Sequence, residues 1–469
     1  MRILSLVALS LAIGAPLLAQ APGLTVSKGD SDVTVYGILD AGLAEVAHTT
    51  GFDSYHPVAV NPTATKFGAT SATGMVNGGI SQTRWGIKGG TGLGDGWKGI
   101  FVLESAINIP NGNISNVALG AAQSTASGPF MSADSAINGQ LFSRGAYFGI
   151  SSDAYGTLTF GRHQSFMLEV IPAYDALQGS QFYTPLGFSG TYGGGGATDN
   201  SRIDNAIRYK LKVADFNFGL MHKFGGATGS STARAIDEFL AGYEKGPFGI
   251  QFAYQSCKDA TAVSNLETAT ATTSTTLNTS GLPLQAGQAP MVTYTYANSG
   301  QIKATFEDTK AYMLAARYYL AHWTFRAGYQ KQELSNPSNP ALDANTTSLF
   351  GQQVGSVSVT PFTVNGAQME KDLAVTWLTV GYQLTPRLNL AVGYYHIGQN
   401  DFSNGLNTAA GAADKAGSSV YQSFLADYRW TKSFDIYLGY MNNQLNDGMA
   451  AGYLYSNNHV FGFGARLAF

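Results

Sequence analysis

The sequence is poor in cysteine, in charged residues and in long apolar runs. Its 469 residues include a single cysteine, Cys257, which leaves no partner for a disulfide within the chain. Only 12% of the residues are charged, whereas soluble domains usually have roughly 25%. Beyond the N-terminal segment, no apolar run reaches the ~18 residues that a membrane-spanning helix needs. A disulfide-stapled fold and a helical membrane protein are therefore excluded.

Glycine and aromatic residues are abundant instead. The chain has 57 glycines, and 12% of its residues are Phe, Trp or Tyr. Such aromatic content argues against a disordered chain. The mean hydropathy of −0.03 is too polar for a bundle of apolar helices. With 27 basic and 30 acidic residues, the charge balance predicts no nucleic-acid partner. A large β-rich protein remains, either soluble or a barrel in an outer membrane.

The N-terminus has the three parts of a secretory signal peptide. Arg2 precedes the apolar run 3–18, and Ala19-Gln20-Ala21 has the small-x-small form of a cleavage site. A buried N-terminal helix is the alternative. We expect residues 1–21 to be removed on export and residues 22–469 to form one domain. The destination would then be the periplasm, the outer membrane or the medium.

Alternating apolar residues predict antiparallel strands joined by tight turns. Apolar residues occupy even positions in 312–320 and odd positions in 323–329. A two-residue turn requires this switch, because Leu320 and Trp323 then pair and share one face. About sixteen strands of this kind are expected. They lie near 33–47, 80–90, 96–108, 141–152, 155–163, 201–212, 214–224, 235–245, 247–258, 308–320, 323–334, 371–385, 387–398, 418–431, 433–445 and 456–469.

Short connections alternate with long polar ones along the chain. The long ones lie near 48–79, 109–140, 164–200, 259–307 and 335–370, with shorter ones near 225–234, 399–417 and 446–455. Outer-membrane barrels sort their connections in this way, with short periplasmic turns and long outer loops. The Thr-, Ala- and Ser-rich segment 259–307 is expected to be a solvated loop rather than a linker. We predict an all-β transmembrane antiparallel barrel with both termini at the periplasmic end.

Four stretches together carry a family pattern. They are the first strand at 33–42, the hairpin at 84–105, the strand pair at 142–162 and the closing strand at 462–469. This set resembles the general porins of Gram-negative bacteria, in particular the β-proteobacterial and neisserial type. The resemblance implies a homotrimer of sixteen-stranded barrels in the outer membrane, in contact with its lipid and lipopolysaccharide. It implies a water-filled pore without a cofactor, a third outer loop folded inward to narrow that pore, and Phe469 as the C-terminal assembly residue.

The resemblance also assigns residues to the pore. Its motifs place four arginines on the wall of the constriction, opposed by two carboxylates on the third loop: Arg84, Arg144, Arg162 and Arg202 against Glu169 and Asp175. Strand alternation turns further charged residues toward the lumen, namely Lys88, Arg208, Arg317, Arg326, Arg429 and Arg466 with Asp40, Asp204, Asp427 and Asp435.

Two points qualify this assignment. In the strand of Arg162, the same alternation would also turn Leu158 and Phe160 inward. Several arginines could also simply pair with neighbouring carboxylates or carbonyl oxygens. Because bases outnumber acids among the inward positions, a weak anion preference is expected.

Motifs for catalysis or metal binding are weak. None of the seven histidines lies in an H-E-x-x-H arrangement, and the glycine-rich segment 90–96 joins two strands instead of opening a helix. The sequence predicts no catalytic residue and no metal site. The predicted function is passive diffusion of ions and small hydrophilic solutes. Two alternatives remain: a substrate-selective channel with a lumenal binding site, and a barrel that serves as an anchor or adhesion surface.

Overall fold

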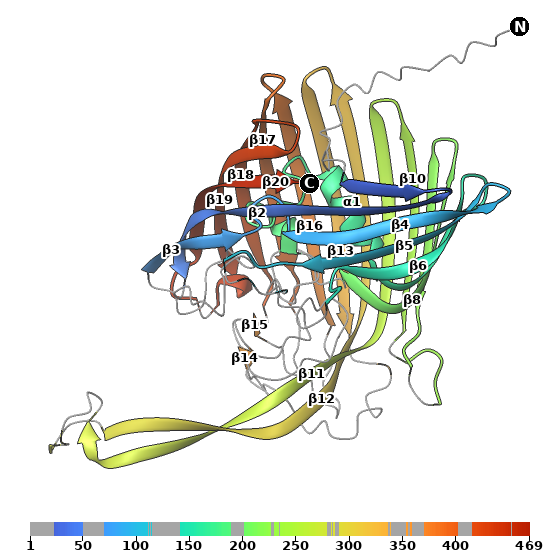
Figure 1. Cartoon of the computed structure of the whole chain (residues 1–469). Helices are drawn as coiled ribbons and strands as arrows, with labels where there is room; N and C mark the ends of the chain where they lie inside the picture. The colour runs from blue at the N-terminus through green and yellow to red at the C-terminus, as the bar shows by residue number, and fades with distance from the viewer. Residues whose placement is uncertain are drawn as a thin grey trace, which may run out of the picture.

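In the computed structural model, antiparallel strands that are neighbours in the sequence pair around one sheet (Figure 1). The structure describes residues 23–49, 70–110, 141–188, 201–226, 229–233, 235–278, 290–335, 353–354, 357–358, 370–401, 415–451 and 453–469, with isolated positions between these ranges. For most of 259–307 it describes the backbone alone. The predicted signal peptide, residues 1–21, lies outside these ranges.

The strands agree closely with those predicted from alternation. They are β1 (Leu24–Lys28), β2 (Ser31–Thr49), β3 (Thr70–Asn77), β4 (Arg84–Gly94), β5 (Trp97–Ala106), β6 (Gly145–Ser152), β7 (Gly156–Gln164), β8 (Arg202–Val213), β9 (Phe216–Lys223), β10 (Ile236–Lys245), β11 (Phe248–Asn278), β12 (Pro290–Leu320), β13 (Trp323–Ser335), β16 (Glu370–Gln383), β17 (Leu388–Gln399), β18 (Gly417–Arg429), β19 (Phe434–Asp447) and β20 (Asn457–Ala468). The two-residue strands β14 (Gln353–Val354) and β15 (Val357–Ser358) form a separate pair. The predicted pairing of Leu320 with Trp323 is confirmed.

The first and last long strands close the barrel. β20 pairs with β2 from Ala468 opposite Ile38 to Val460 opposite Val46. β3 and β4 pair with successive parts of β2, and thus make one stave between them. Counted in this way over the described residues, sixteen staves surround the lumen, which confirms the predicted barrel.

Asp40 explains why β3 and β4 are separate. Its buried carboxylate accepts hydrogen bonds from the backbone N–H groups of Gly79, Ile80 and Ser81, at 3.0, 3.1 and 2.7 Å, and from the Tyr437 hydroxyl at 2.6 Å. These bonds hold the segment between the two strands out of the ladder. The sequence placed residues 70–77 in a loop, because alternation alone does not reveal this break.

Two further elements differ from the prediction. β1 was not expected; it pairs with β2 and lies in line with β20, since Leu24 faces Val35 while Phe469 bonds Gly37. The segment 259–307 was expected to be a solvated loop, but β11 and β12 remain paired as far as Asn278 and Pro290. Its many threonines favour an extended backbone, because β-branched side chains fit a paired strand. The resulting ribbon projects beyond the barrel (Figure 1).

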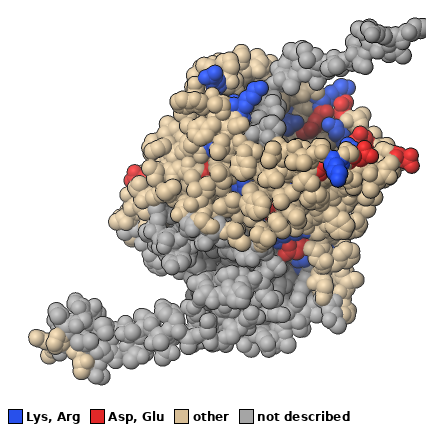
Figure 2. Space-filling model, viewed as in Figure 1, with Lys and Arg blue, Asp and Glu red and all other residues tan. Residues whose placement is uncertain are grey.

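Apolar side chains cover the outer wall. Exposed examples from different staves are Phe148, Leu220, Leu314, Leu378 and Phe463. Few charged residues interrupt the visible part of this wall (Figure 2). This is the outward pattern of a membrane barrel. None of the described helices is both long and apolar enough to cross a membrane.

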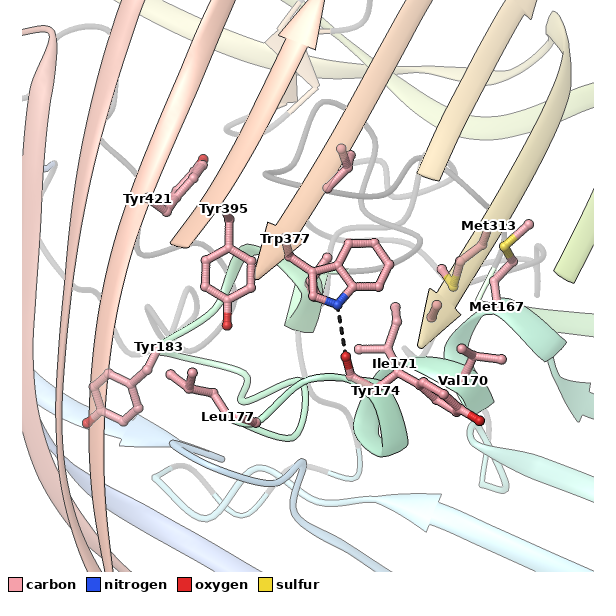
Figure 3. Packing of buried hydrophobic residues seen from close by; sticks show 14 of the residues in the cluster. Met167, Val170, Ile171, Tyr174, Leu177, Tyr183, Met313, Trp377, Tyr395 and Tyr421 are labelled. Atoms are coloured by element: carbon pink, nitrogen blue, oxygen red, sulfur yellow. Dashed lines mark hydrogen bonds between the residues drawn. The ribbon is translucent and has the colours of Figure 1, made fainter. Parts of the chain in front are cut away.

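The buried core lies inside the barrel. A segment that follows β7 enters the lumen as helix α1 (Phe166–Tyr174), and then a short helical turn, η1 (Pro185–Phe188). Its aromatic and aliphatic side chains pack against large side chains on the inner wall, notably Trp377, Tyr395 and Tyr421 (Figure 3). The residues that the sequence assigned to the lumen wall are charged, so this apolar cluster was missed. The loop and the inner wall thus share one hydrophobic cluster inside the lumen.

Candidate functional site

Helix α1 begins at a well-formed cap inside the lumen. Ser165 accepts a hydrogen bond from the Leu168 backbone N–H at 3.1 Å, as an N-cap residue does. The Phe166 backbone N–H donates to the Glu238 carboxylate on β10, at 3.0 Å. The loop is therefore tied to the wall from its first turn.

Asp175 ends the helix and is wholly buried. Its carboxylate accepts hydrogen bonds from the backbone N–H groups of Leu177 and Gly179, at 3.2 and 2.8 Å, and from the Tyr395 hydroxyl at 2.8 Å. Arg326 donates to the Asp175 carbonyl oxygen. Burial raises the pKa of Asp175, and these hydrogen bonds and the charge of Arg326 oppose that rise. Asp175 holds the backbone of the loop and has no exposed surface with which to meet a passing ion, unlike its predicted role.

Glu169 faces a different part of the wall from the one predicted. Its carboxylate contacts the Arg208 guanidinium at 2.6 Å and the Lys210 ammonium at 3.0 Å, both on β8. Burial raises the pKa of Glu169, but the charges of Arg208 and Lys210 outweigh burial and lower it to about 2. Glu169 is thus a charged partner of Arg208, which the sequence placed on the lumen wall.

The four predicted arginines come together on β4, β7 and β8 and at the start of β6. Arg144 contacts the Glu104 carboxylate at 2.6 Å, and Arg84 reaches the same carboxylate at 3.7 Å. Tyr36 donates its hydroxyl to Glu104 at 3.0 Å. Glu104 therefore joins Arg84 and Arg144 through one carboxylate. We call the four residues Arg84, Arg144, Arg162 and Arg202 the arginine cluster.

Arg162 reaches the cluster because the ladder between β7 and β8 is irregular. The register slips between Gly161 and His163, where Gly161 has φ of 135° and Asn205 on β8 has φ of 51°. Phe160 consequently stays on the outer wall while Arg162 turns inward. There Arg162 contacts Asp204 and donates to the Ser143 carbonyl at 2.8 Å. The conflict between Arg162 and Phe160 in the sequence is resolved by this irregularity.

Arg202 completes the cluster. It donates to the Ser201 carbonyl at 2.9 Å and lies 3.5 Å from the Gln82 amide oxygen. It interacts electrostatically with Arg144, Arg162, Arg84 and Glu104. Within the described residues, its Nε and the Nη1 of Arg144 have no hydrogen-bond partner. Within the part of the chain that the structure describes, the four arginines outnumber the carboxylates that contact them, Glu104 and Asp204, by two.

Two further predicted lumen residues, Arg317 and Arg326, lie along the wall near α1. Arg317 contacts Glu244 at 2.7 Å and stacks over the Tyr174 ring, with 5.0 Å between the guanidinium carbon and the ring centre. Arg326 binds the loop backbone, as described for Asp175. Lys88 is exposed on β4, 4.9 Å from the centre of the Tyr36 ring.

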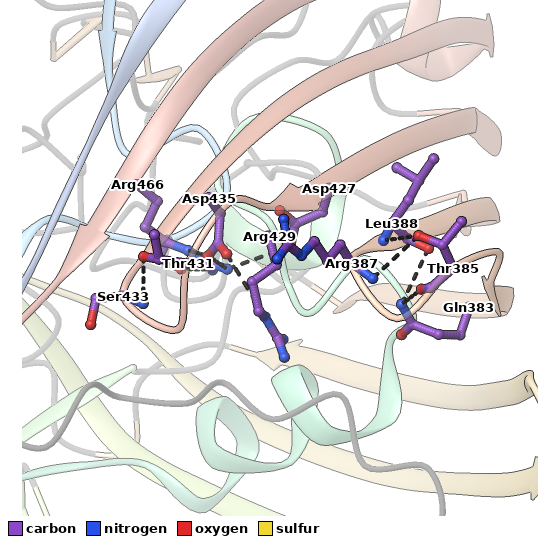
Figure 4. A network of polar contacts seen from close by, with 11 residues as sticks. Gln383, Thr385, Arg387, Leu388, Asp427, Arg429, Thr431, Ser433, Asp435 and Arg466 are labelled. Atoms are coloured by element: carbon purple, nitrogen blue, oxygen red, sulfur yellow. Dashed lines mark hydrogen bonds and ion pairs between the residues drawn. The ribbon is translucent and has the colours of Figure 1, made fainter.

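A second polar network lies where β16 to β20 approach their short turns (Figure 4). Arg466 contacts Asp435 at 2.7 Å and Asp427 at 3.5 Å, and donates to the Ser81 hydroxyl at 2.9 Å. Arg429 lies 3.9 Å from Asp435. Strand alternation predicted that these four residues face the lumen, and their ion pairs join them into one group.

Several residues that shape this site were missed. Trp377 donates its indole N–H to the Tyr174 carbonyl at 2.9 Å (Figure 3), and Thr379 accepts from the Ala176 backbone N–H at 2.8 Å. Their inward position on β16 was the available signal, whereas their contacts with the loop join residues about two hundred positions apart. Among the described residues, no three His, Cys, Asp or Glu side chains are grouped to hold a metal ion.

Comparison with known proteins finds similar sequences among the porins. A family model of Gram-negative porins matches residues 5–354. An outer membrane porin of Bordetella pertussis is 28% identical over 257 residues, which cover 52% of this chain and 58% of that relative. The match therefore spans little more than half of the relative's length.

Two solved structures share the fold. An anion-selective porin from Comamonas acidovorans aligns with a TM-score of 0.57 and 17% identity, over 94% of this chain and 100% of that one. The trimer form of OmpT, an outer membrane protein of Vibrio cholerae, gives 0.50 and 14%, over 94% and 100%. The family match covers most of the sequence, and the closed barrel with its inward loop agrees with it. This chain belongs to the family of Gram-negative porins.

Proposed function

We propose that the chain forms a water-filled channel in the outer membrane for passive diffusion of ions and small hydrophilic solutes. The observation that carries this proposal is the closed barrel, whose outer wall is apolar and whose lumen holds a charged inward loop. Such a wall separates lipid from an internal polar path. No step of the proposed transport needs a catalytic residue, a metal or a cofactor.

The arginine cluster supports a weak anion preference. An excess of positive charge in a confined, poorly solvated passage raises the local concentration of anions. The similar porin from Comamonas acidovorans is described as anion-selective. In our proposal Arg84, Arg144, Arg162 and Arg202 form the cationic side of the constriction. Glu169 pairs with Arg208 and Lys210, further along β8 from Arg202, and Asp175 positions the loop.

Planar-bilayer recordings test the channel and its preference separately. The purified protein should give stable single-channel conductance, and a salt gradient should give a reversal potential on the anion side. A barrel without conductance would refute the channel. Clear cation preference would refute the proposed role of the arginine cluster but not the channel. Concentration-dependent block by one solute would favour a substrate-selective channel instead.

Arg202→Gln examines the cluster directly. Removal of one of the cluster's positive charges should shift the reversal potential toward zero, because fewer anions are held near the constriction. Lys432→Gln, which removes an exposed charge in the turn between β18 and β19, is the control and should leave the reversal potential unchanged. An equal shift in both variants would assign the preference to net charge in general.

We further propose that the channel assembles as a homotrimer and contacts lipid and lipopolysaccharide. The trimer form of the similar Vibrio cholerae protein supports the oligomer. We also propose that residues 1–21 are a signal peptide, and that Phe469, which bonds Gly37 through both backbone groups at 2.9 and 3.0 Å, directs assembly of the barrel. Native-gel mobility and the N-terminal sequence of the mature protein test the oligomer and the cleavage.

A further inference from the structure

Three glycines on the inner wall each lie beneath a buried aromatic ring. Gly219 on β9 faces Phe166, Gly328 on β13 faces Trp377, and Gly439 on β19 faces Tyr183. A Cβ atom at these glycines would come within 2.5, 2.0 and 2.6 Å of the rings, closer than real Cβ contacts allow. We call these three positions the glycine seats. Any larger residue at a glycine seat would displace the ring above it.

The glycine seats hold the loop at both ends and in the middle. Phe166 opens α1, and Tyr183 lies just before η1. Trp377 comes from the wall; its indole lies over Gly328 and donates its N–H to the Tyr174 carbonyl, at the end of α1. All three rings are at most 1% exposed. The seats lie on β9, β13 and β19, so they fix the loop from separate parts of the wall.

Hydrogen bonds between the seats add further contacts between the loop and the wall. The Ala176 backbone N–H donates to Thr379, as described above. Further along, the Ser180 hydroxyl and the Phe182 backbone N–H both donate to the Gly79 carbonyl, at 2.9 and 3.1 Å. The loop is thus bonded to the break between β3 and β4 as well as to β16.

We propose that the glycine seats and Trp377 are positioning residues that fix segment 166–183 as a stationary partition of the lumen. With the segment fixed, the wall and the segment together set a constant width and charge for the passage, and the segment does not open or close as a gate. This inference rests on the proposed channel function. It is separable from it, because the tests compare variants whose channels must first conduct.

Gly439→Ala tests the seat beneath Tyr183. The added methyl group should push the ring and its backbone toward the channel axis, so that single-channel conductance falls about two-fold and the reversal potential shifts. The matched control is Gly398→Ala on β17, where the new Cβ would lie 3.5 Å or more from its neighbours. The control should conduct as the wild type does. Wild-type conductance and reversal potential in folded Gly439→Ala would overturn the proposal.

A reversible tether tests immobility independently. An ideal Cβ on Gly381 lies 3.8 Å from the Cβ of Ala176, the mean Cβ separation of about 3.8 Å in disulfides. Ala176→Cys and Gly381→Cys are combined with Cys257→Ser, and with Thr324→Ala to make room for the new side chain. Mass spectrometry confirms that the disulfide forms.

The oxidised and reduced forms of this one protein are then compared. If the segment is already stationary, then conductance, reversal potential and open-channel current noise should not differ between them. Loss of closures or of noise on oxidation would show a moving gate and overturn the proposal. Failure of the two thiols to join would contradict the close, fixed approach of the segment to β16. Absence of current in the wild type would instead refute the channel function.

Discussion

At the scale of single residues, the Glu169 carboxylate lowers the net charge of the group that it forms with Arg208 and Lys210. It neutralises one of the two cations it contacts, Arg208 and Lys210, and leaves the pair with a single excess charge. Glu169→Gln should therefore add one uncompensated positive charge and increase anion preference, shifting the reversal potential further to the anion side. Gln keeps the shape of the side chain, so the conductance should change little. A shift toward cations would contradict this account.

The low pKa of Glu169 determines how its contribution to stability changes with pH. Its pKa in the folded protein, about 2, lies below the ordinary value near 4.5. The stability that its ion pairs contribute is thus fully present above the ordinary value and is lost as pH falls through about 2. Reversal potentials of the wild type should change little between pH 7 and pH 4 on account of Glu169. A transition near pH 4.5 that disappears in Glu169→Gln would refute the low pKa.

The orientation of a side chain was predictable only where the strand pattern is regular. Arg208, Arg317 and Arg326 face inward as alternation requires. Arg162 turns inward only because Gly161 and Asn205 adopt positive φ, a local irregularity that no periodic pattern contains. Asp175 was predicted to line the pore, since it is a carboxylate on the inward loop. Its burial follows from the turn at Leu177–Gly179 and from Tyr395, a contact between distant residues.

At the scale of elements, the break between β3 and β4 links the wall to the loop. Asp40 holds this break, and the Gly79 carbonyl within it accepts two hydrogen bonds from the loop. Asp40→Asn replaces one carboxylate oxygen with an amide NH2 group, which cannot accept hydrogen bonds from the N–H donors that face it. The lost bonds should destabilise the barrel by about 1–3 kcal/mol, because buried donors remain unsatisfied.

The melting temperature in detergent, followed by circular dichroism, measures this loss. Asp32→Asn is the control, since Asp32 is exposed on the same strand β2. It should melt with the wild type. If both variants melt together, Asp40 does not hold the break. A change in conductance of Asp40→Asn below its melting temperature would show that the break also positions the loop.

The elements themselves were largely predictable, because each strand alternates between lipid and lumen. The exceptions have physical causes. β3 and the break at Asp40 depend on a carboxylate in another strand. The ribbon of β11 and β12 continues past the barrel through a Thr-rich sequence, in which polarity suggested a loop while β-branching favours pairing. The packing of α1 on Trp377 and Tyr395 depends on contacts across the lumen, which alternation within one strand does not encode.

At the scale of the whole molecule, the outer wall should lie in a bilayer, whose polarity falls from the interfaces to the midplane. Leu378, in the middle of β16, and Leu384, in the short turn after it, are both about half exposed, at 57% and 51%. In surroundings of uniform polarity, substitution of either leucine by arginine would lower the free energy of unfolding by a similar amount. In a bilayer, arginine on the lipid face costs about 2–4 kcal/mol at the midplane and about 0–1 kcal/mol near the interface.

Leu378→Arg should therefore destabilise the barrel in lipid vesicles much more than Leu384→Arg does. Reversible denaturant unfolding in vesicles measures both free energies against the wild type. The two leucines differ mainly in depth, so each variant serves as the control for the other. Because Leu378 points outward, neither change should alter the reversal potential of the folded channel. Equal losses of stability would mean that β16 does not cross the bilayer, whereas the expected difference would locate Leu378 near its midplane.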